Sequence, residues 1–348
     1  MELFKSSTNF DFMAWRVPSL IISAILCVAS LGIVFIHGLD YGLDFEGGAL
    51  VEVKYKESAE IADIRASLEG AGFKNAVVQA LGTTTEYAIR IKPHDGEGAA
   101  PAPAADAGKA AQSKEGEAAA KESEAAASES VAKAATDKIA KEVLAALQKN
   151  RADVSIKRSE FVGASVGEEL RSQGLVAVLF VILGIMVYLW IRFEWRFAVA
   201  AVASEIHDTL ITVGIFALTG REFDLPALAA VLSVVGYSIN DKVVVFDRVR
   251  EIFRASRKDV PYDVLNRSIN STMSRTIMTG LTTGLAVGTL YFVGGPALEN
   301  FGLIMLIGIA VGTLSSVFFA NPILLYLGVS KQDLMAMTKE DPELARRP

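Results

Sequence analysis

The sequence contains a single cysteine, Cys27, which lies inside the first long apolar segment. This excludes an intramolecular disulfide and a metal centre built from several thiolates. Only three histidines are present, His37, His94 and His207, and none has the spacing of a zinc site. We therefore expect neither a metal nor a cofactor.

Signatures of common enzymes and of nucleic-acid binding are also missing from the sequence. It contains no glycine-rich phosphate loop and no motif around a nucleophilic serine or cysteine, so we expect that the protein is not an enzyme. The net charge is −6. The sequence has no basic domain with interleaved aromatic residues that could cover a phosphate backbone. We therefore expect that nucleic acid is not a partner.

Apolar residues are abundant, at 51% of the 348 residues, which is typical of a polytopic membrane protein. A cleaved signal peptide is the competing interpretation of the first apolar run. The length of that run, about 20 residues, and the lack of a small-x-small cleavage site favour a retained anchor. Six apolar runs are predicted to span a membrane: residues 17–36, 175–191, 197–218, 225–246, 276–293 and 301–327.

Lysine and arginine are distributed unevenly between the loops that connect these runs. By the positive-inside rule, the basic loops and both termini are cytoplasmic; the family resemblance described below implies a bacterial inner membrane. One of the alternate loops carries only Arg221, and the loop at residues 294–300 carries no basic residue. The basic residues on the cytoplasmic side are Lys5, Arg16, Arg192, Arg196, Arg248, Arg250, Arg254, Arg257, Lys258, Arg267, Arg346 and Arg347.

The segment between the first two spans has the periodicity of a small soluble domain. The pattern predicts strands at 49–56, 76–81, 87–92 and 154–162 and helices at 60–71 and 132–149. The order βαββαβ is that of a ferredoxin-like fold. Residues 93–136 have almost no large apolar side chain and are predicted to be a disordered insertion.

The predicted fold class is therefore a polytopic α-helical membrane protein. It has six transmembrane helices and an extracytoplasmic α+β, ferredoxin-like domain between helices 1 and 2. The predicted domains are 1–38 (cytoplasmic N-terminus and first helix), 39–173 (periplasmic domain), 174–328 (helices 2–6) and 329–348 (cytoplasmic tail).

Asp241 lies about two-thirds of the way along the fourth apolar run. A carboxylate in that position costs roughly 2.5–3.5 kcal/mol on insertion scales. At helical spacing Asp241 shares a polar face with Tyr237, Asn240 and Arg248. Two interpretations are open: a buried polar group that fixes helix packing, or a proton or ion site.

The third span carries Glu205, His207 and Asp208 near its middle, so this helix is expected to face inward. Glu205 and Asp208 share a face, whereas His207 points about 100° away from Asp208. The three residues form either a neutral, hydrogen-bonded cluster that positions helices or a relay to Asp241. Lys242 is expected to point about 100° away from Asp241 and to snorkel toward the cytosol.

The fifth span begins with Arg275 and continues with Thr279. Arg275 either snorkels to the cytoplasmic interface or turns inward as the counter-charge of Asp241. Glycines repeat every four residues here and in the sixth span, which predicts close helix packing. These glycines are Gly280, Gly284, Gly288, Gly308 and Gly312.

Several motifs together resemble the SecF proteins of the SecD/SecF family of protein-export membrane proteins, within the RND superfamily. They are GLDFEGG at 42–48, RFEWRFA at 192–198, the pair His207-Asp208, GYSINDKVVVFDRVRE at 236–251, the segment 271–280 and GGPALENFGLIMLIGIAVGT at 294–313. The resemblance covers the chain except for the insertion.

The resemblance implies a six-span half-transporter that pairs with SecD beside the SecYEG channel. Such a pair uses the proton-motive force to draw unfolded preproteins out of the membrane. YajC, YidC and membrane lipid are the further partners implied. The family pattern makes Asp241 the proton-carrying carboxylate and Arg275 and Thr279 its functional partners.

Three residues depart from the family pattern. The family commonly has a small polar residue in place of Lys242, an apolar one in place of Glu205, and Thr or Lys in place of Glu46. Two alternatives to the implied function are an RND-type half-transporter that exports lipids or small molecules, and a purely structural accessory subunit of the translocon.

Overall fold

The computed structural model describes residues 9–73, 76–81, 84–91, 134, 136–255 and 260–330. The predicted insertion at 93–136 lies outside the described residues except for 134 and 136. The predicted tail at 329–348 lies outside them except for its first two residues.

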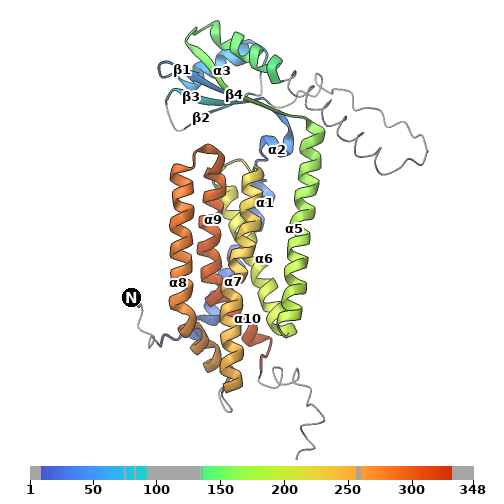
Figure 1. Ribbon diagram of the computed structural model, residues 1–348, viewed down its shortest axis with the longest axis vertical. Helices are drawn as coiled ribbons and strands as arrows, with labels where there is room; N and C mark the ends of the chain where they lie inside the picture. The colour runs from blue at the N-terminus through green and yellow to red at the C-terminus, as the bar shows by residue number, and fades with distance from the viewer. Residues whose placement is uncertain are drawn as a thin grey trace, which may run out of the picture. The chain divides into compact units, whose positions relative to one another are not determined.

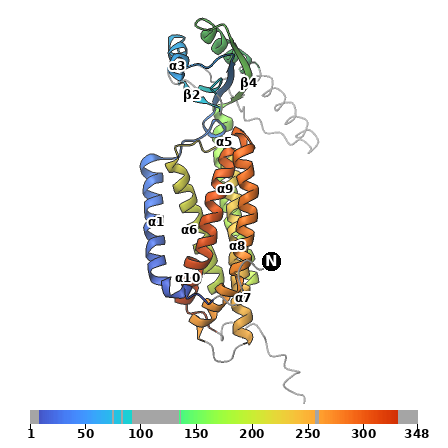
Figure 2. The same ribbon diagram turned by 90° about the vertical axis from the view of Figure 1, so that its left-hand side faces the viewer.

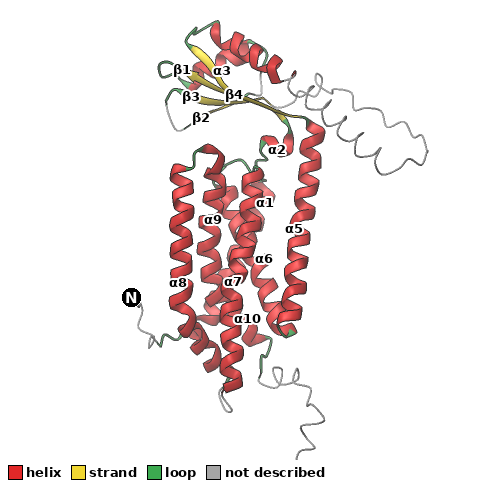
Figure 3. Ribbon diagram, viewed as in Figure 1, coloured by secondary structure: helices red, strands yellow, loops and turns green. Residues whose placement is uncertain are grey.

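The chain divides into two compact units. One is Tyr41–Gly174, here called the α+β unit, and the other, the helical unit, combines Met1–Asp40 with Leu175–Pro348. All described strands belong to the α+β unit (Figure 3).

The α+β unit contains a four-stranded antiparallel sheet in the order β2-β3-β1-β4. β1 is central and pairs with β3 on one side and with β4 on the other. This confirms the small α+β domain expected from the sequence. Its elements (Figure 1) are β1 (Gly48–Tyr55), α3 (Ile61–Gly70), β2 (Val77–Ala80), β3 (Glu86–Ile91), a helix over residues 136–148 and β4 (Val154–Val162).

Two consecutive glycines, Gly47 and Gly48, let the chain turn from a short helix, α2 (Leu43–Glu46), into β1. Their φ angles are 75° and 125°, a region that favours glycine. A Cβ on Gly48 would also lie 2.5 Å from the carbonyl oxygen of Ile91 on the neighbouring strand. The glycine pair at the end of the motif 42–48 is therefore required by the local backbone.

Alternate side chains of β1 point to the core of the α+β unit. Val51, Val53 and Tyr55 are buried. They pack in one cluster with Leu68 of α3 and Leu147 of the second helix. The period of two along the strand and the inner stripes of both helices therefore meet in a single core.

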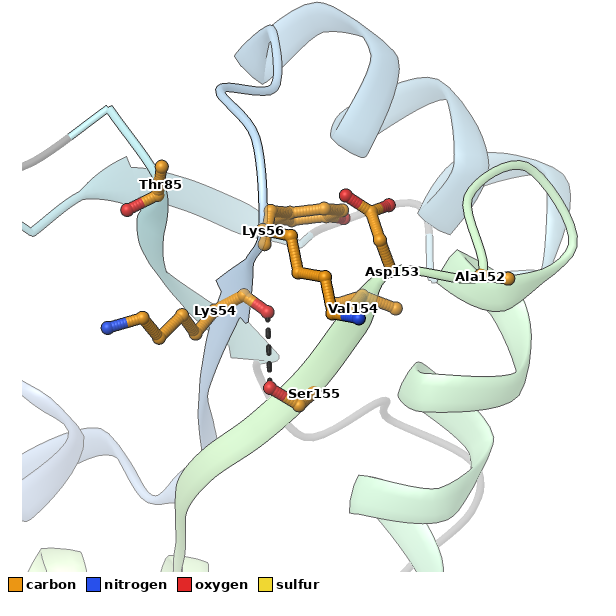
Figure 4. A pocket seen from close by; sticks show the side chains of 8 residues that line it. Lys54, Lys56, Thr85, Ala152, Asp153, Val154 and Ser155 are labelled. Atoms are coloured by element: carbon orange, nitrogen blue, oxygen red, sulfur yellow. Dashed lines mark hydrogen bonds between the residues drawn. The ribbon is translucent and has the colours of Figure 1, made fainter.

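A cavity of about 350 Å³ lies where β1 ends and β4 begins (Figure 4). Lys54 and Lys157 each pair with Glu86 at 2.9 Å, and hydrogen bonds from both lysines lower the pKa of Glu86. A hydrogen bond from Arg151 likewise lowers the pKa of Asp153. Burial raises the pKa of Tyr55 to about 12, so its phenol stays protonated. The charged neighbours Lys54, Glu86, Arg151 and Asp153 are held in ion pairs. The lining residues are Lys54, Tyr55, Lys56, Thr85, Ala152, Asp153, Val154 and Ser155.

Six helices in the described ranges are long and apolar enough to cross a membrane (Figures 1 and 2). The chain is thus a multi-pass membrane protein, as predicted. The helices are α1 (Arg16–His37, after a 3-10 turn at Phe12–Trp15), α5 (Ala164–Arg192), α6 (Trp195–Leu218), α7 (Leu225–Ala255), α8 (Pro261–Val293) and α9 (Pro296–Ser315). The last continues through a π-helical turn (Ser316–Ala320) into α10 (Asn321–Tyr326).

The helices α7 and α8 extend beyond the apolar runs predicted at 225–246 and 276–293. Apolar side chains in these extensions are buried, among them Phe253, Val264 and Ile269. They alternate with charged and amide residues, so the extensions are amphipathic and have low mean hydropathy. A search for apolar runs therefore misses them.

The helices α6, α7 and α9 form the centre of the helical unit. Over their most apolar stretch they bury 56, 44 and 50% of their residues, compared with 11, 6 and 11% for α1, α5 and α8. The three outer helices expose large apolar side chains, such as Phe180, Leu285 and Phe292. Such surfaces are suited to contact lipid tails or the helices of a partner.

Candidate functional site

Asp241 and Lys242 are consecutive residues of α7 that face different neighbouring helices. Successive side chains on an α-helix point about 100° apart. Asp241 contacts Thr279 of α8, and we call this pair the aspartate site. The lysine cluster comprises Lys242, Glu205, His207, Asp208, Ser238 and Ser315.

The aspartate site holds a carboxylate whose hydrogen bonds are incomplete. The Asp241 side chain is buried, with 3% exposure. Its Oδ1 accepts a long hydrogen bond of 3.5 Å from the Thr279 hydroxyl, whereas Oδ2 has no hydrogen-bond partner among the described residues. A buried, incompletely bonded carboxylate is costly in its ionised form. The unsatisfied oxygen is therefore suited to bind a proton.

Two other residues predicted at the aspartate site lie on the surface of the helical unit. Arg275, one helical turn before Thr279, is exposed and forms no ion pair with a described residue. Asn240 is also exposed. The structure thus holds Asp241 in a state without a salt bridge, and its pairing with Arg275 stays a prediction.

Lys242 is completely buried, with 0% exposure. Its Nζ donates hydrogen bonds to Glu205 Oε2 at 2.8 Å, to Asp208 Oδ2 at 2.7 Å and to Ser238 Oγ at 2.8 Å. These bonds use all three protons of the ammonium group. Both carboxylates come from one face of α6 because they are three residues apart.

Asp208 connects three helices. Its Oδ2 also accepts hydrogen bonds from the hydroxyls of Ser238 on α7 and Ser315 on α9, both at 2.6 Å. Its Oδ1 lies 2.8 Å from Nδ1 of His207, whose ring stacks on Phe319 at a centroid distance of 4.0 Å. The lysine cluster therefore ties α6, α7 and α9 together through fully buried polar groups.

The predicted snorkelling of Lys242 is wrong, because two carboxylates of α6 neutralise its charge inside the helical unit. His207 also differs from expectation. It was expected to point about 100° away from Asp208 on the helix, yet the two side chains turn toward each other and are in contact. The inward orientation of the three ionisable groups on α6 is confirmed, since Glu205, His207 and Asp208 are 4, 6 and 0% exposed.

The lysine cluster does not reach the aspartate site in this conformation. No hydrogen bond or ion pair between described residues joins the cluster to Asp241, so a relay between them stays a prediction. The cluster links three helices through hydrogen bonds between ionisable and hydroxyl side chains. Sequence reasoning missed two serines. Ser238 precedes Lys242 by four residues and was detectable from helical spacing, whereas Ser315 depends on the packing of α9.

The two glycines of α9 bring this helix into close contact with α7. A Cβ on Gly308 would overlap the branched side chain of Val234. A Cβ on Gly312 would lie 2.7 Å from Oγ of Ser238, inside the lysine cluster. The packing role proposed for these two positions is therefore supported by the geometry.

The glycines of α8 behave differently. A Cβ on Gly284 or Gly288 would meet no described atom within 4 Å, and one on Gly280 would make contacts of 3.4 Å and longer. This seam does not hold α8 tightly against the other described helices, contrary to expectation. It leaves Gly284 and Gly288 available to a partner helix or to lipid.

Replacing Gly308 by alanine is expected to destabilise the helical unit by about 1–3 kcal/mol, because the stiff side chain of Val234 cannot move aside easily. Replacing Gly284 by alanine is the matched control, and it should be neutral or stabilise by up to about 1 kcal/mol through helix propensity. Thermal unfolding of the purified protein in detergent compares the two. Equal effects would contradict the difference between the α8 and α9 seams.

Among the described residues, no group of three or more His, Cys, Asp or Glu side chains is arranged to hold a metal ion. The carboxylates of Glu205 and Asp208 are bridged by Lys242. The ionisable groups of the helical unit can exchange protons and ion pairs.

Comparisons with known proteins place these features in context. The family model described as "Protein export membrane protein SecD/SecF, C-terminal" matches residues 138–330, and "SecD/SecF GG Motif" matches residues 32–59. The protein translocase subunit SecF of Pseudomonas aeruginosa is 37% identical over 335 residues, covering 96% of each chain. That of Escherichia coli O157:H7 is 36% identical, covering 97% of this chain and 94% of the relative.

Two solved structures are also similar. The translocon-associated membrane protein SecDF of Thermus thermophilus matches 93% of this chain with 31% identity and a TM-score of 0.73. SecDF in a super-membrane-facing form matches 100% of it with 30% identity and a TM-score of 0.59. The chain spans only 39 and 41% of these two SecDF chains.

Proposed function

We propose that this chain, which belongs to the SecF proteins of the SecD/SecF family of protein-export membrane proteins, is a Sec-pathway translocation subunit that works together with SecD. The similarity to translocase subunits runs through both units and covers 96% of the Pseudomonas relative. The SecDF chains are more than twice as long as the region they share with this chain. SecD would supply the remainder.

We further propose that the proton-motive force drives this subunit through Asp241. The observation that carries the proposal is the burial of Asp241 with Oδ2 unsatisfied, beside the Thr279 hydroxyl of a neighbouring helix. Ionisable residues at such positions in a membrane helix are expensive and typically functional. The helix α8, which carries Thr279 and Arg275, is the element whose position can respond to the charge of Asp241.

The proposed cycle alternates between two states of Asp241: protonated and unpaired, or ionised and paired with Arg275. Arg275 lies one helical turn from Thr279, so a modest movement of α8 would bring its guanidinium to the carboxylate. Moving one charge through 100 mV supplies about 2.3 kcal/mol, which biases a two-state equilibrium about fiftyfold. This bias would move the α+β unit against an emerging polypeptide.

The proposed setting is the bacterial inner membrane, with both termini cytoplasmic and the α+β unit on the outer side. The basic loops between the helices support this orientation. The proposed partners are SecD, the SecYEG translocon, YajC, YidC, lipid and an unfolded preprotein. The exposed apolar faces of α1, α5 and α8 provide the surface for helix and lipid contacts.

Depletion of the chain in its host is expected to slow the export of proteins that carry a signal sequence. In depleted cells, collapse of the proton gradient should slow export only slightly further, because the chain through which the gradient acts on export is already missing. Processing of pulse-labelled precursors, with and without an uncoupler at constant ATP, measures both effects.

Depleted cells supplied with the chain from a plasmid are the control for this experiment. Equal processing in depleted and resupplied cells would contradict the role in translocation. An equal response of both to the uncoupler would contradict only the coupling to protons.

A further inference from the structure

The ammonium group of Lys242 sits in a cage of oxygen atoms. Glu205 Oε2, Asp208 Oδ2 and Ser238 Oγ surround Nζ at 2.7–2.8 Å. The Ser315 hydroxyl bonds to the same oxygen of Asp208. Carboxylate and hydroxyl oxygens are the ligands that hard metal cations prefer. The composition of the cage is therefore that of a site for a hard monovalent cation, occupied here by a lysine.

The cage also has a spare ligand and an excess of negative charge. Oε1 of Glu205 has no hydrogen-bond partner among the described residues, and the Glu205 side chain is only 4% exposed. Two carboxylates face one ammonium group. Among the described residues, the other ionisable side chain in contact with them is His207, which lies beside Asp208. A buried site of this kind needs positive charge, from a cation or from bound protons, to balance its carboxylates.

Lys242 is attached to α7, so the cation in the cage cannot leave without the helix. A free cation in the same place would bind and dissociate and could couple its own gradient to helix movement. A tethered cation instead holds α6, α7 and α9 together throughout the cycle. The aspartate site lies on the other face of α7 and stays open to change.

We propose that Lys242 is a tethered cation that permanently fills a Na⁺-type site in the helical unit and thereby restricts coupling to protons at Asp241. The restriction to protons rests on the proposed function, whereas the filled site does not. Removal of the ammonium group with its oxygen cage left intact would open the site to Na⁺.

The test compares Lys242→Ser with the unmodified full chain, each co-expressed and purified with SecD. Thermal unfolding is followed in NaCl and in choline chloride of the same ionic strength. A cation that binds only the folded state stabilises it in proportion to ln(1 + [L]/Kd). The midpoint of Lys242→Ser should therefore rise by several degrees with the concentration of Na⁺, and the midpoint of the unmodified protein should be the same in both salts.

Two further variants serve as controls. Arg248→Ser removes a cation from an exposed ion pair with Glu251 on the same helix, and it should respond to salt as the unmodified protein does. The triple variant Lys242→Ser, Glu205→Gln, Asp208→Asn lacks the charges of the cage and should lose the specific response to Na⁺.

A midpoint of Lys242→Ser that is equal in both salts would overturn the proposal, as would an equal Na⁺ response in the triple variant. If Lys242→Ser accumulates only in Na⁺, the proposal is supported; if it accumulates in neither salt while the triple variant folds, the proposal fails. Export by the unmodified protein should run at the same rate with Na⁺ and with choline. A failure of the export function would leave the unfolding result unaffected, so the two failures are distinguishable.

Discussion

Replacement of Asp241 by asparagine is expected to abolish the proton-dependent part of protein export while the protein stays folded. Asparagine has nearly the same shape and keeps an oxygen that can accept the hydrogen bond from Thr279. Because Oδ2 of Asp241 has no partner among the described residues, the amide group interrupts no existing bond. Asparagine cannot take up or release a proton, so the roughly fiftyfold bias from a 100 mV potential is lost.

Precursor processing in cells that carry only the Asp241→Asn chain measures this effect. Their rate should equal that of depleted cells and should not respond to an uncoupler. Asp247→Asn is the matched control, because Asp247 lies on the same helix but is 41% exposed and paired with Arg192. That variant should export normally. An Asp241→Asn chain that responds to the gradient as the unmodified chain does would rule out Asp241 as the proton carrier.

Replacement of Asp208 by alanine is expected to reduce the stability of the helical unit by about 3–5 kcal/mol, the usual effect of breaking a buried ion pair. Asp208 accepts hydrogen bonds from Lys242, Ser238 and Ser315 and contacts His207. Its loss leaves the ammonium group of Lys242 with a single carboxylate partner, Glu205. The hydroxyls of Ser238 and Ser315 also lose the carboxylate oxygen that accepts their hydrogen bonds. Denaturant unfolding of the purified complex measures the loss.

Asp247→Ala serves as the control for a carboxylate in an exposed ion pair, with an expected effect of about 0–1 kcal/mol. Glu205→Ala should fall between the two, because only one of its oxygens accepts a hydrogen bond. Equal destabilisation by Asp208→Ala and Asp247→Ala would show that the lysine cluster contributes little to stability.

The secondary structure and the number of spans were predictable from the sequence because they depend on neighbours along the chain. Six apolar runs gave six helices, since a bilayer requires hydrophobicity over about 20 consecutive residues. The alternation in β1 gave a strand with Val51, Val53 and Tyr55 inside. The extensions of α7 and α8 were missed because their buried residues are interspersed with charges.

Part of the candidate site was also predictable. Asp241 stood out because a carboxylate in an apolar run is costly. Thr279, which only the family resemblance linked to it, makes a long hydrogen bond of 3.5 Å to it, and the functional role of Thr279 stays a prediction. Gly308 and Gly312 do allow close packing, whereas Gly284 and Gly288 have the same spacing without a neighbour. The spacing of small residues identifies a possible seam but does not say which helix, if any, lies against it.

The number and order of the spans, the small α+β domain and the unusual position of Asp241 are properties of the sequence alone, because each depends on residues close together in the chain. The partner of Lys242 is not determined by the sequence alone. Helical spacing places its side chain about 100° from that of Asp241 but does not say which helix occupies that direction. The packing of α6 against α7 decided it: Glu205 and Asp208, at 2.8 and 2.7 Å, provide the buried ammonium group with the oppositely charged partners that burial requires.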